Sequence, residues 1–322
     1  MIEFQPYPIL FKPILKERIW GGNKLKTVLN KSNVTNTTGE SWEISSIENE
    51  VSIILNGIYQ DINLTQLIND FPLETLGTSV FKKFGKEFPL LFKFLDAKQE
   101  LSIQVHPNDA LAKKRHQSFG KTEMWYVIQA EENAKIIVGF KEKSSPEEYL
   151  HHLENKTLLK ILNEIVVKKG DVFLLESGTI HAIGAGIVIA EIQQTSDITY
   201  RVYDWDRMDS HGNARELHTD LALEAINYNT KNTKKEYSKT LNVSNLAVDC
   251  PFFTTKIIPL QGEIIFKTNK QSFTVLMCTD GDFELHYNNQ TEQYNIGDTI
   301  LIPAFLTDFK LTGKATILEI SL

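Results

Sequence analysis

The chain has 322 residues, with 34 basic and 41 acidic side chains and a formal charge of −7, so its length suits two domains of about 150 residues or one elaborate domain. Hydrophobic residues make up 42% and charged residues 23%, which is typical of a globular protein that can bury a sizeable core. The acidic balance, without a Lys/Arg-rich stripe, argues against a general nucleic-acid binder.

Turn residues and apolar runs in the first 230 residues indicate an all-β protein with helices inserted between strands. Helical periodicity runs from Leu64 to about Phe84, and Pro72 is expected to break it into two helices. A capping box with Pro at its first helical position, Ser145 to Glu148, predicts a helix toward Leu162. A third helix is expected at 214–228. Strands are expected at 101–106, 124–128, 135–140, 172–175 and 186–192.

Beyond a polar linker at 227–239 the pattern is nearly pure β and predicts a second, smaller barrel of roughly 80 residues. A repeat supports this division, because Gly170-Asp171 and Gly297-Asp298 each precede an apolar strand. We therefore expect two domains, residues 1–235 and 236–322. The strands expected in the second lie at 252–258, 263–266, 273–278, 283–287, 299–302 and 315–320.

Four polar residues of the first half have no evident use in a purely structural barrel. Strand alternation puts Gln104 and His106 on one face, Glu123 opens the next strand, and His181 follows a turn before another. Two imidazoles, a carboxylate and an amide oxygen suit a divalent transition metal, and the absence of sulfur favours a catalytic site. The other six histidines are interpreted as structural or surface residues: His116, His151, His152, His211, His218 and His286.

Charged residues near this cluster suggest what the pocket would bind. Lys121 lies two residues before Glu123, so alternation would aim both side chains into one cavity, and Glu191 and Arg201 flank the polar turn after the His181 strand. Surface ion pairs would explain these residues equally well. Together with a metal, however, they would suit a phosphorylated, oxygen-rich substrate.

At these residues the chain resembles the type I mannose-6-phosphate isomerases of the short bacterial kind, which are zinc enzymes of the cupin superfamily. A generic cupin would carry His-x-His where this chain has Gln104-Val105-His106, so the resemblance is specific to the isomerases. It covers about residues 10–210 in detail. The matching stretches are Trp20-Gly21-Gly22, Gly39 to Glu43, Pro89 to Lys93, Leu101 to Asp109, Lys121 to Trp125, Gly178 to Ala182, and Glu191 to Arg201.

The resemblance implies a fold and a set of site residues. The fold would be mainly β with inserted helices, built as two double-stranded β-helix (cupin) jelly-roll barrels. One Zn²⁺ in the N-terminal cupin would be held by Gln104, His106, Glu123 and His181. The second barrel has no histidine at the place of His181, so we expect its metal site to be lost. The catalytic residues would be Arg201, Glu191 and Lys121, and the substrate-binding residues Lys93, Trp20 and Ser41.

The implied reaction is the reversible, metal-dependent interconversion of mannose 6-phosphate and fructose 6-phosphate through a cis-enediolate. Two alternatives stay open from the residues themselves: an Fe(II)-dependent cupin oxygenase, because two His and one carboxylate also form its metal triad, and a non-catalytic sugar-binding protein with two cupins. The N-terminus lacks the features of a signal peptide, and the most apolar stretch is too short to cross a bilayer. We expect a cytoplasmic monomer or weak homodimer without a membrane partner.

Overall fold

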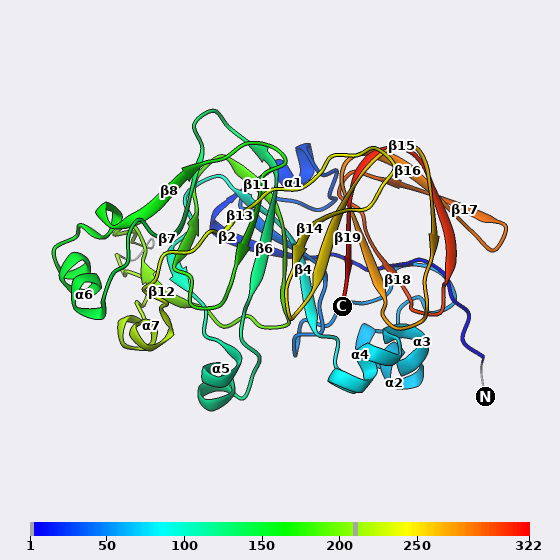
Figure 1. Cartoon of the computed structure of the whole chain (residues 1–322), viewed down its shortest axis with the longest axis horizontal. Helices are drawn as coiled ribbons and strands as arrows, with labels where there is room; N and C mark the ends of the chain where they lie inside the picture. Colours follow the sequence, from blue (N-terminus) through cyan, green and yellow to red (C-terminus); the bar gives the residue numbers. More distant parts are fainter. Residues whose placement is uncertain (1–2, 209–211) are drawn as a thin grey trace.

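The structure is a computed structural model that describes residues 3–208 and 212–322. The fold is mainly β, as predicted, and the described strands form three sheets. Two sheets occupy the N-terminal part and the third occupies the C-terminal part, with the short helices at the periphery (Figure 1). Within the two described ranges, no helix combines the length and apolar character needed to span a membrane.

The two N-terminal sheets carry the residues predicted to form the site. The first sheet has the strand order β13-β9-β6-β11-β4-β3-β2, and the second has the order β12-β5-β10-β7-β8. The first contains β2 (Ile14–Gly22), β3 (Thr38–Ile44), β4 (Leu90–Ala97), β6 (Glu123–Ala130), β9 (Val172–Leu175), β11 (Ile187–Gln194) and β13 (Lys234–Lys235). The second contains β5 (Ile103–Val105), β7 (Lys135–Phe140), β8 (Leu162–Val166), β10 (His181–Ile183) and β12 (Tyr200–Tyr203).

The C-terminal sheet joins both ends of the chain, because a short N-terminal strand pairs with β18. Its order is β1-β18-β16-β19-β15-β14, with β17 paired to β16. The strands are β1 (Ile9–Leu10), β14 (Asn245–Asp249), β15 (Thr254–Lys267), β16 (Thr274–Tyr287), β17 (Gln290–Asn295), β18 (Thr299–Ile302) and β19 (Asp308–Ser321).

The prediction of separate strands at 252–258 and 263–266, and at 273–278 and 283–287, was wrong. Each pair is one continuous strand of 14 residues. A glycine lies inside each of these strands, in the gap between the predicted shorter ones: Gly262 adopts φ 125° and Gly281 φ 71°. The register of β16 against β19 also shifts between Cys278 and Asp280. Positive φ and a bulge thus bend these strands without ending them.

The helices are short, and their caps explain where they begin. Asn63, Asn108 and Ser145 each accept a hydrogen bond from a backbone N–H of the first turn. The segment from Leu64 forms three helices where two were expected, and Pro72 begins the second of them. The helix after Ser145 ends at Glu154, before the predicted Leu162. The helices are α1 (Lys24–Thr27), α2 (Leu64–Asp70), α3 (Pro72–Leu76), α4 (Thr78–Phe84), α5 (Asp109–His116), α6 (Pro146–Glu154) and α7 (Thr219–Ala225), with a 3₁₀ turn at Leu158–Lys160.

The expected repeat has a structural counterpart, although closed barrels were not found. Gly170 and Gly297 adopt nearly the same φ, 88° and 93°, and each lies two residues before its strand, β9 or β18. Among the described residues, no strand pairing connects the two ends of any sheet. The linker predicted at 227–239 contributes the short strand β13, which pairs with β9.

Strand alternation in the first sheet divides two cores. On β11, Val188, Ala190 and Ile192 pack in a core shared with the C-terminal sheet, whereas Ile187 and Ile189 pack in a separate core on the other face. The second face also carries residues of β4 and β6, such as Leu95 and Trp125. Polar residues that continue this face along the same strands are therefore buried between the sheets.

Candidate active site

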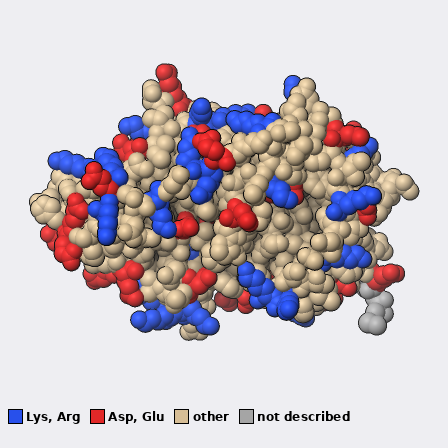
Figure 2. All heavy atoms as spheres, in the orientation of Figure 1, with Lys and Arg blue, Asp and Glu red and all other residues tan. Residues whose placement is uncertain are grey.

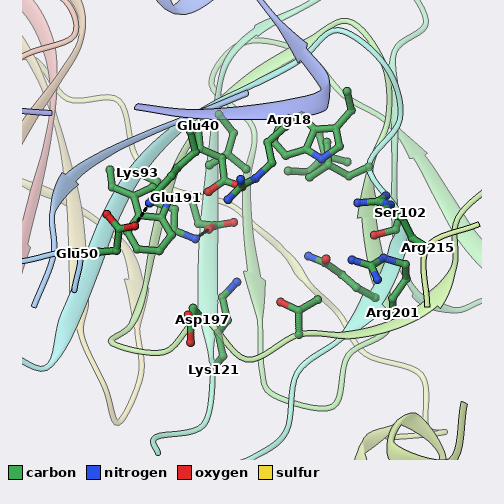
Figure 3. A pocket seen from close by; sticks show the side chains of 18 residues that line it. Arg18, Glu40, Glu50, Lys93, Ser102, Lys121, Glu191, Asp197, Arg201 and Arg215 are labelled. Carbon is green, nitrogen blue, oxygen red and sulfur yellow. Dashed lines mark hydrogen bonds and ion pairs between the residues drawn. The ribbon is translucent and has the colours of Figure 1, made fainter. Parts of the chain in front are cut away.

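A cavity of about 500 Å³ opens where the second face of the first sheet meets β5 and β12. This volume suits a small-molecule ligand. Figure 3 shows charged side chains of both signs pointing into it, with Arg201, Arg215 and Ser102 at one end and Glu40, Glu50, Lys93 and Glu191 at the other. Its lining residues are Lys16, Arg18, Trp20, Glu40, Trp42, Glu50, Lys93, Leu95, Leu101, Ser102, Gln104, Lys121, Ile183, Glu191, Asp197, Thr199, Arg201 and Arg215.

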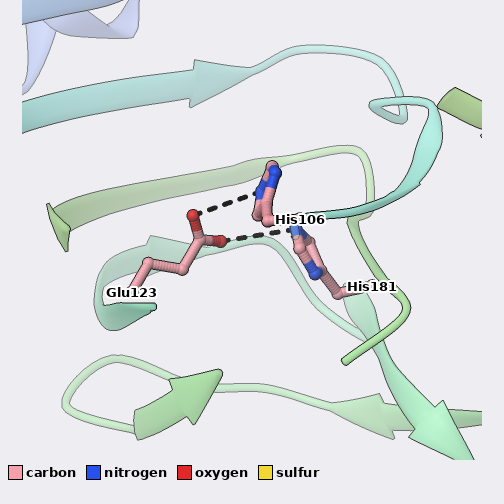
Figure 4. A group of neighbouring side chains, drawn as sticks. All are labelled: His106, Glu123 and His181. Atoms are coloured by element: carbon pink, nitrogen blue, oxygen red, sulfur yellow. Dashed lines mark ion pairs between the residues drawn. The ribbon is translucent and has the colours of Figure 1, made fainter. Parts of the chain in front are cut away.

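Two imidazoles flank one carboxylate beside this cavity (Figure 4). His106 Nε2 lies 3.5 Å from one oxygen of Glu123, and His181 Nε2 lies 3.4 Å from the other. All three residues are at most 1% exposed, and their ligand atoms lie within 4.8 Å of one another. The sequence-predicted His, Glu and His thus converge, although 75 residues separate the two histidines.

The hydrogen bonds of the two Nδ1 atoms determine which nitrogen of each imidazole carries the proton. His106 Nδ1 lies 2.9 Å from the carbonyl oxygen of Ile198, and His181 Nδ1 lies 2.8 Å from that of Thr179. A carbonyl only accepts, so each Nδ1 carries the proton and each Nε2 presents a lone pair to Glu123. Burial, the largest cause, lowers the pKa of His106 to about 3 and also lowers that of His181. Both side chains are therefore neutral.

These lone pairs fit a cation. His106 Nε2 and both oxygens of Glu123 are buried and have no well-formed hydrogen bond, an arrangement that is costly unless a positive charge lies between them. Burial alone would raise the pKa of Glu123, but the charge of Lys121 opposes burial and the pKa lies well below its usual range, so the carboxylate is ionised. Nitrogen and carboxylate donors without sulfur suit a divalent transition metal.

Gln104, the fourth predicted ligand, lies beside this group. It is the register partner of His181 across β5 and β10, and its Nε2 lies 3.2 Å from His181 Nε2. The two ends of a side-chain amide exchange by a half-turn of its last bond, which would present Oε1 at the same place. The residue is therefore within reach of a metal held by the other three.

Two lysines are paired with carboxylates in the cavity. Lys121 Nζ lies 3.1 Å from Glu123, as alternation predicted. Lys93 Nζ lies 3.1 Å from Glu191 Oε1, and the indole N–H of Trp125 donates to Glu191 Oε2 at 3.0 Å. These side chains are at most 7% exposed. The carboxylate of Glu191 is thus held in one orientation at the cavity wall.

Two arginines form the opposite end. Arg201 is the register partner of Gln104 across β12 and β5, and its Nη1 donates to the carbonyl of Glu216 at 2.8 Å. Its Nε is buried without a hydrogen bond. Burial and then the charge of Arg215 lower the pKa of Arg201, so two like charges lie close together. Among described residues, Arg201 is the lining cation without a carboxylate partner.

Of the three expected substrate-binding residues, Trp20 and Lys93 line the cavity and Ser41 does not. Ser41 is fully buried, and its hydroxyl donates to Glu43 at 2.5 Å. Alternation along β3 puts Ser41 and Glu43 on the face opposite Glu40 and Trp42. The placement of Ser41 in the substrate pocket is therefore corrected.

Several cavity residues were missed in the sequence. Glu40 binds Arg18 Nε at 2.8 Å and Trp42 Nε1 at 2.6 Å, and Lys16 pairs with Glu50 at the rim. For Glu40 and Trp42 a signal was available, because both lie in the matching stretch from Gly39 to Glu43 and alternate along β3. The other missed lining residues include Ser102, Asp197 and Arg215.

The remaining described histidines lie outside the cavity lining. His116 bonds the Tyr200 hydroxyl at 2.8 Å, His152 bonds Thr157 at 2.7 Å, and His218 accepts from the backbone of Arg201 at 2.9 Å. His151 and His286 also have hydrogen-bond partners. His211 lies outside the described residues.

Comparisons with known proteins agree over nearly the whole chain. A sequence model of the phosphomannose isomerase type I catalytic domain matches residues 9–137, and one of the mannose-6-phosphate isomerase cupin domain matches residues 243–322. The chain is 36% identical to mannose-6-phosphate isomerase ManA of Bacillus subtilis over 96% of both proteins. It is 35% identical to the mannose-6-phosphate isomerase of Streptococcus mutans over 97% of both. The solved structure of mannose 6-phosphate isomerase from Bacillus subtilis is similar with a TM-score of 0.89 at 34% identity, covering 99% of this chain and 100% of that one.

Proposed function

Because the chain belongs to the type I phosphomannose isomerase family, we infer that it interconverts mannose 6-phosphate and fructose 6-phosphate. The reaction moves a proton between two neighbouring carbons through a cis-enediolate. It therefore needs a group that takes and returns the proton and cations that stabilise the negative charge. The observation that carries this proposal is the buried His106, Glu123 and His181 set beside a charged cavity of about 500 Å³.

We propose that one zinc ion is held by Gln104, His106, Glu123 and His181. With zinc–nitrogen bonds of about 2.0–2.1 Å, donor atoms of a tetrahedral site lie about 3.4 Å apart, close to the 3.4 and 3.5 Å found between the imidazoles and Glu123. Bound zinc would supply a Lewis acid for a substrate oxygen.

Glu191 is the proposed proton carrier. Lys93 and Trp125 hold its carboxylate at the cavity wall, which keeps it oriented toward a substrate. A zinc-bound water and His106 are the alternative candidates for moving the proton. His106 is the weaker rival, because its Nδ1 is engaged by a carbonyl and its Nε2 faces Glu123. Glu191→Gln should lower kcat by about 10²–10⁴-fold. Asp197→Asn serves as its comparison, because Asp197 also lines the cavity but has no ion pair among the described residues.

Cations on both sides of the metal group would stabilise charge. Lys121 lies against Glu123, and Arg201 stands beside Gln104, so both would face substrate oxygens that become negative. Arg215 and Ser102 extend the Arg201 end of the cavity (Figure 3), and we place the phosphate there. Trp20 and Lys93 would contact the sugar.

The finer architecture is also a proposal. Each half would be a cupin jelly-roll barrel, with the boundary at 235/236, which is consistent with the matched cupin domain at 243–322 and with the equivalent Gly170 and Gly297. Pro303 and Ala304 follow β18 where no histidine corresponds to His181, so the second half would bind no metal. The protein would act in the cytoplasm as a monomer or weak homodimer.

A coupled assay of fructose 6-phosphate formation tests the function. Purified protein loaded with zinc should convert mannose 6-phosphate, and His181→Ala should abolish turnover, whereas His151→Ala, at an exposed helical histidine, should not. Absence of turnover in the zinc-loaded protein would contradict the proposal. Oxygen consumption after loading with Fe(II) would instead favour the oxygenase.

A further inference from the structure

Asp204 lies just beyond β12 and binds two arginines at once. It is 5% exposed. Its Oδ2 accepts from Arg215 Nε at 2.6 Å, its Oδ1 accepts from Arg215 Nη2, and Arg207 Nη2 donates to Oδ1 at 2.8 Å. A two-point contact of this kind fixes both the position and the plane of a guanidinium. Asp204 itself does not line the cavity.

The orientation of Arg215 matters because it lies near a second guanidinium. Arg201 and Arg215 both line the same end of the cavity, and their like charges repel. Arg215 is 30% exposed on a long side chain, so without a partner it would turn toward solvent. Asp204, which does not line the cavity, opposes that movement by binding Nε and Nη2, and no hydrogen bond from Arg215 Nη1 to the described part of the chain is formed.

We propose that Asp204 is a positioning residue that holds the Arg215 guanidinium beside Arg201, so that the two cations together bind the phosphate of the substrate. This rests on the proposed function, since it assigns the phosphate to that end of the cavity. Asp204 touches no substrate atom and acts through Arg215. It would thereby set the preference for phosphorylated over unphosphorylated sugars.

Steady-state kinetics and direct phosphate binding test this role in four variants of the zinc-loaded chain. They are Asp204→Asn, Arg215→Gln, the double variant, and Asp206→Asn as the control. Asp206 is an exposed carboxylate two residues away that pairs with Lys156. The measurements are kcat and KM for mannose 6-phosphate and the Kd of inorganic phosphate by titration calorimetry.

Asp204→Asn should raise both KM and the phosphate Kd by about 10- to 100-fold, the range for a lost charge-assisted contact, with kcat changed by less than about threefold. Arg215→Gln should do the same, and the double variant should be no worse than Arg215→Gln alone, because the two residues act as one unit. The control should match the wild type.

Unchanged KM and phosphate Kd in either folded single variant would overturn the proposal, as would effects that multiply in the double variant. Should Asp204→Asn not fold, Arg215→Gln decides, because it leaves the Arg207–Asp204 pair in place. A wild-type protein that binds phosphate through these residues but does not turn over mannose 6-phosphate would refute the proposed function and leave the role of Asp204 intact.

Discussion

The carboxylate of Glu40 should make the stability of the fold depend on pH, and Glu40→Gln tests this. Glu40 is 9% exposed and accepts from Arg18 Nε at 2.8 Å and Trp42 Nε1 at 2.6 Å. Burial alone would raise its pKa, but Lys93 and Arg18 outweigh burial and lower the pKa from 4.5 to about 2. The folded state therefore favours the charged form more strongly than the unfolded state does.

The size of the effect follows from this difference. At about 1.36 kcal/mol for each pKa unit, ionised Glu40 stabilises the fold by about 3 kcal/mol. A lowered pKa means that this contribution is fully present above pH 4.5 and is lost as the pH falls toward about 2. By pH 3 about 2 kcal/mol of it is gone.

Urea unfolding followed by tryptophan fluorescence, in chelator so that no metal contributes, measures the effect at pH 7 and pH 3. Glu40→Gln keeps the shape of the side chain and should be about 3 kcal/mol less stable than the wild type at pH 7 but only about 1 kcal/mol less stable at pH 3. Glu48→Gln, at an exposed carboxylate of the following loop, should show little difference at either pH. An equal loss for Glu40→Gln at both pH values would refute the reasoning.

Three further predictions concern the free energy of unfolding and use the same measurement. Gly297→Ala should lower the free energy of unfolding by about 2–4 kcal/mol, because φ is 93° and an added Cβ would lie 2.1 Å from the Leu29 carbonyl oxygen. Gly139→Ala is its control: φ is 74° but nothing lies within 4 Å of the added Cβ, so the loss should be only about 1 kcal/mol. Equal losses in the two variants would contradict the clash at Gly297. Lys93→Met should lower the free energy of unfolding by about 3 kcal/mol, because it leaves Glu191 buried without its cation. An unchanged free energy would show that the pair is not buried in solution. Asn108→Ala should cost about 1 kcal/mol through loss of the hydrogen bond from the Leu111 N–H, and no change would mean that this cap does not hold α5.

Local patterns predicted which side chains near Glu123 share a face, because strand alternation relates neighbouring residues directly. Gln104 with His106, and Lys121 with Glu123, were expected to point the same way, and Lys121 and Glu123 meet at 3.1 Å. The same rule would have placed Glu40 and Trp42 in the cavity. Ser41 was misplaced because a whole matching stretch was carried over, although alternate residues of a strand face opposite sides.

Other features depend on distant contacts that no local pattern contains. Gly262 and Gly281 resemble turn residues, but cross-strand pairing along β19 continues through both, so long strands replaced the predicted short ones. The contact of Asp204 with Arg215 needs the chain to reverse between them, and neither residue type nor spacing reveals where a side chain returns. The end of the cavity that carries Arg215 was therefore found only in the structure.

The central claim is that one metal ion at His106, Glu123 and His181 supports isomerisation of mannose 6-phosphate. The most direct test adds zinc stepwise to protein from which chelation has removed the metal, and measures turnover after each addition. The metal-free protein should show no turnover, and turnover should rise linearly until one zinc per chain has been added. Full turnover by the metal-free protein, or the same titration curve from His181→Ala, would contradict it.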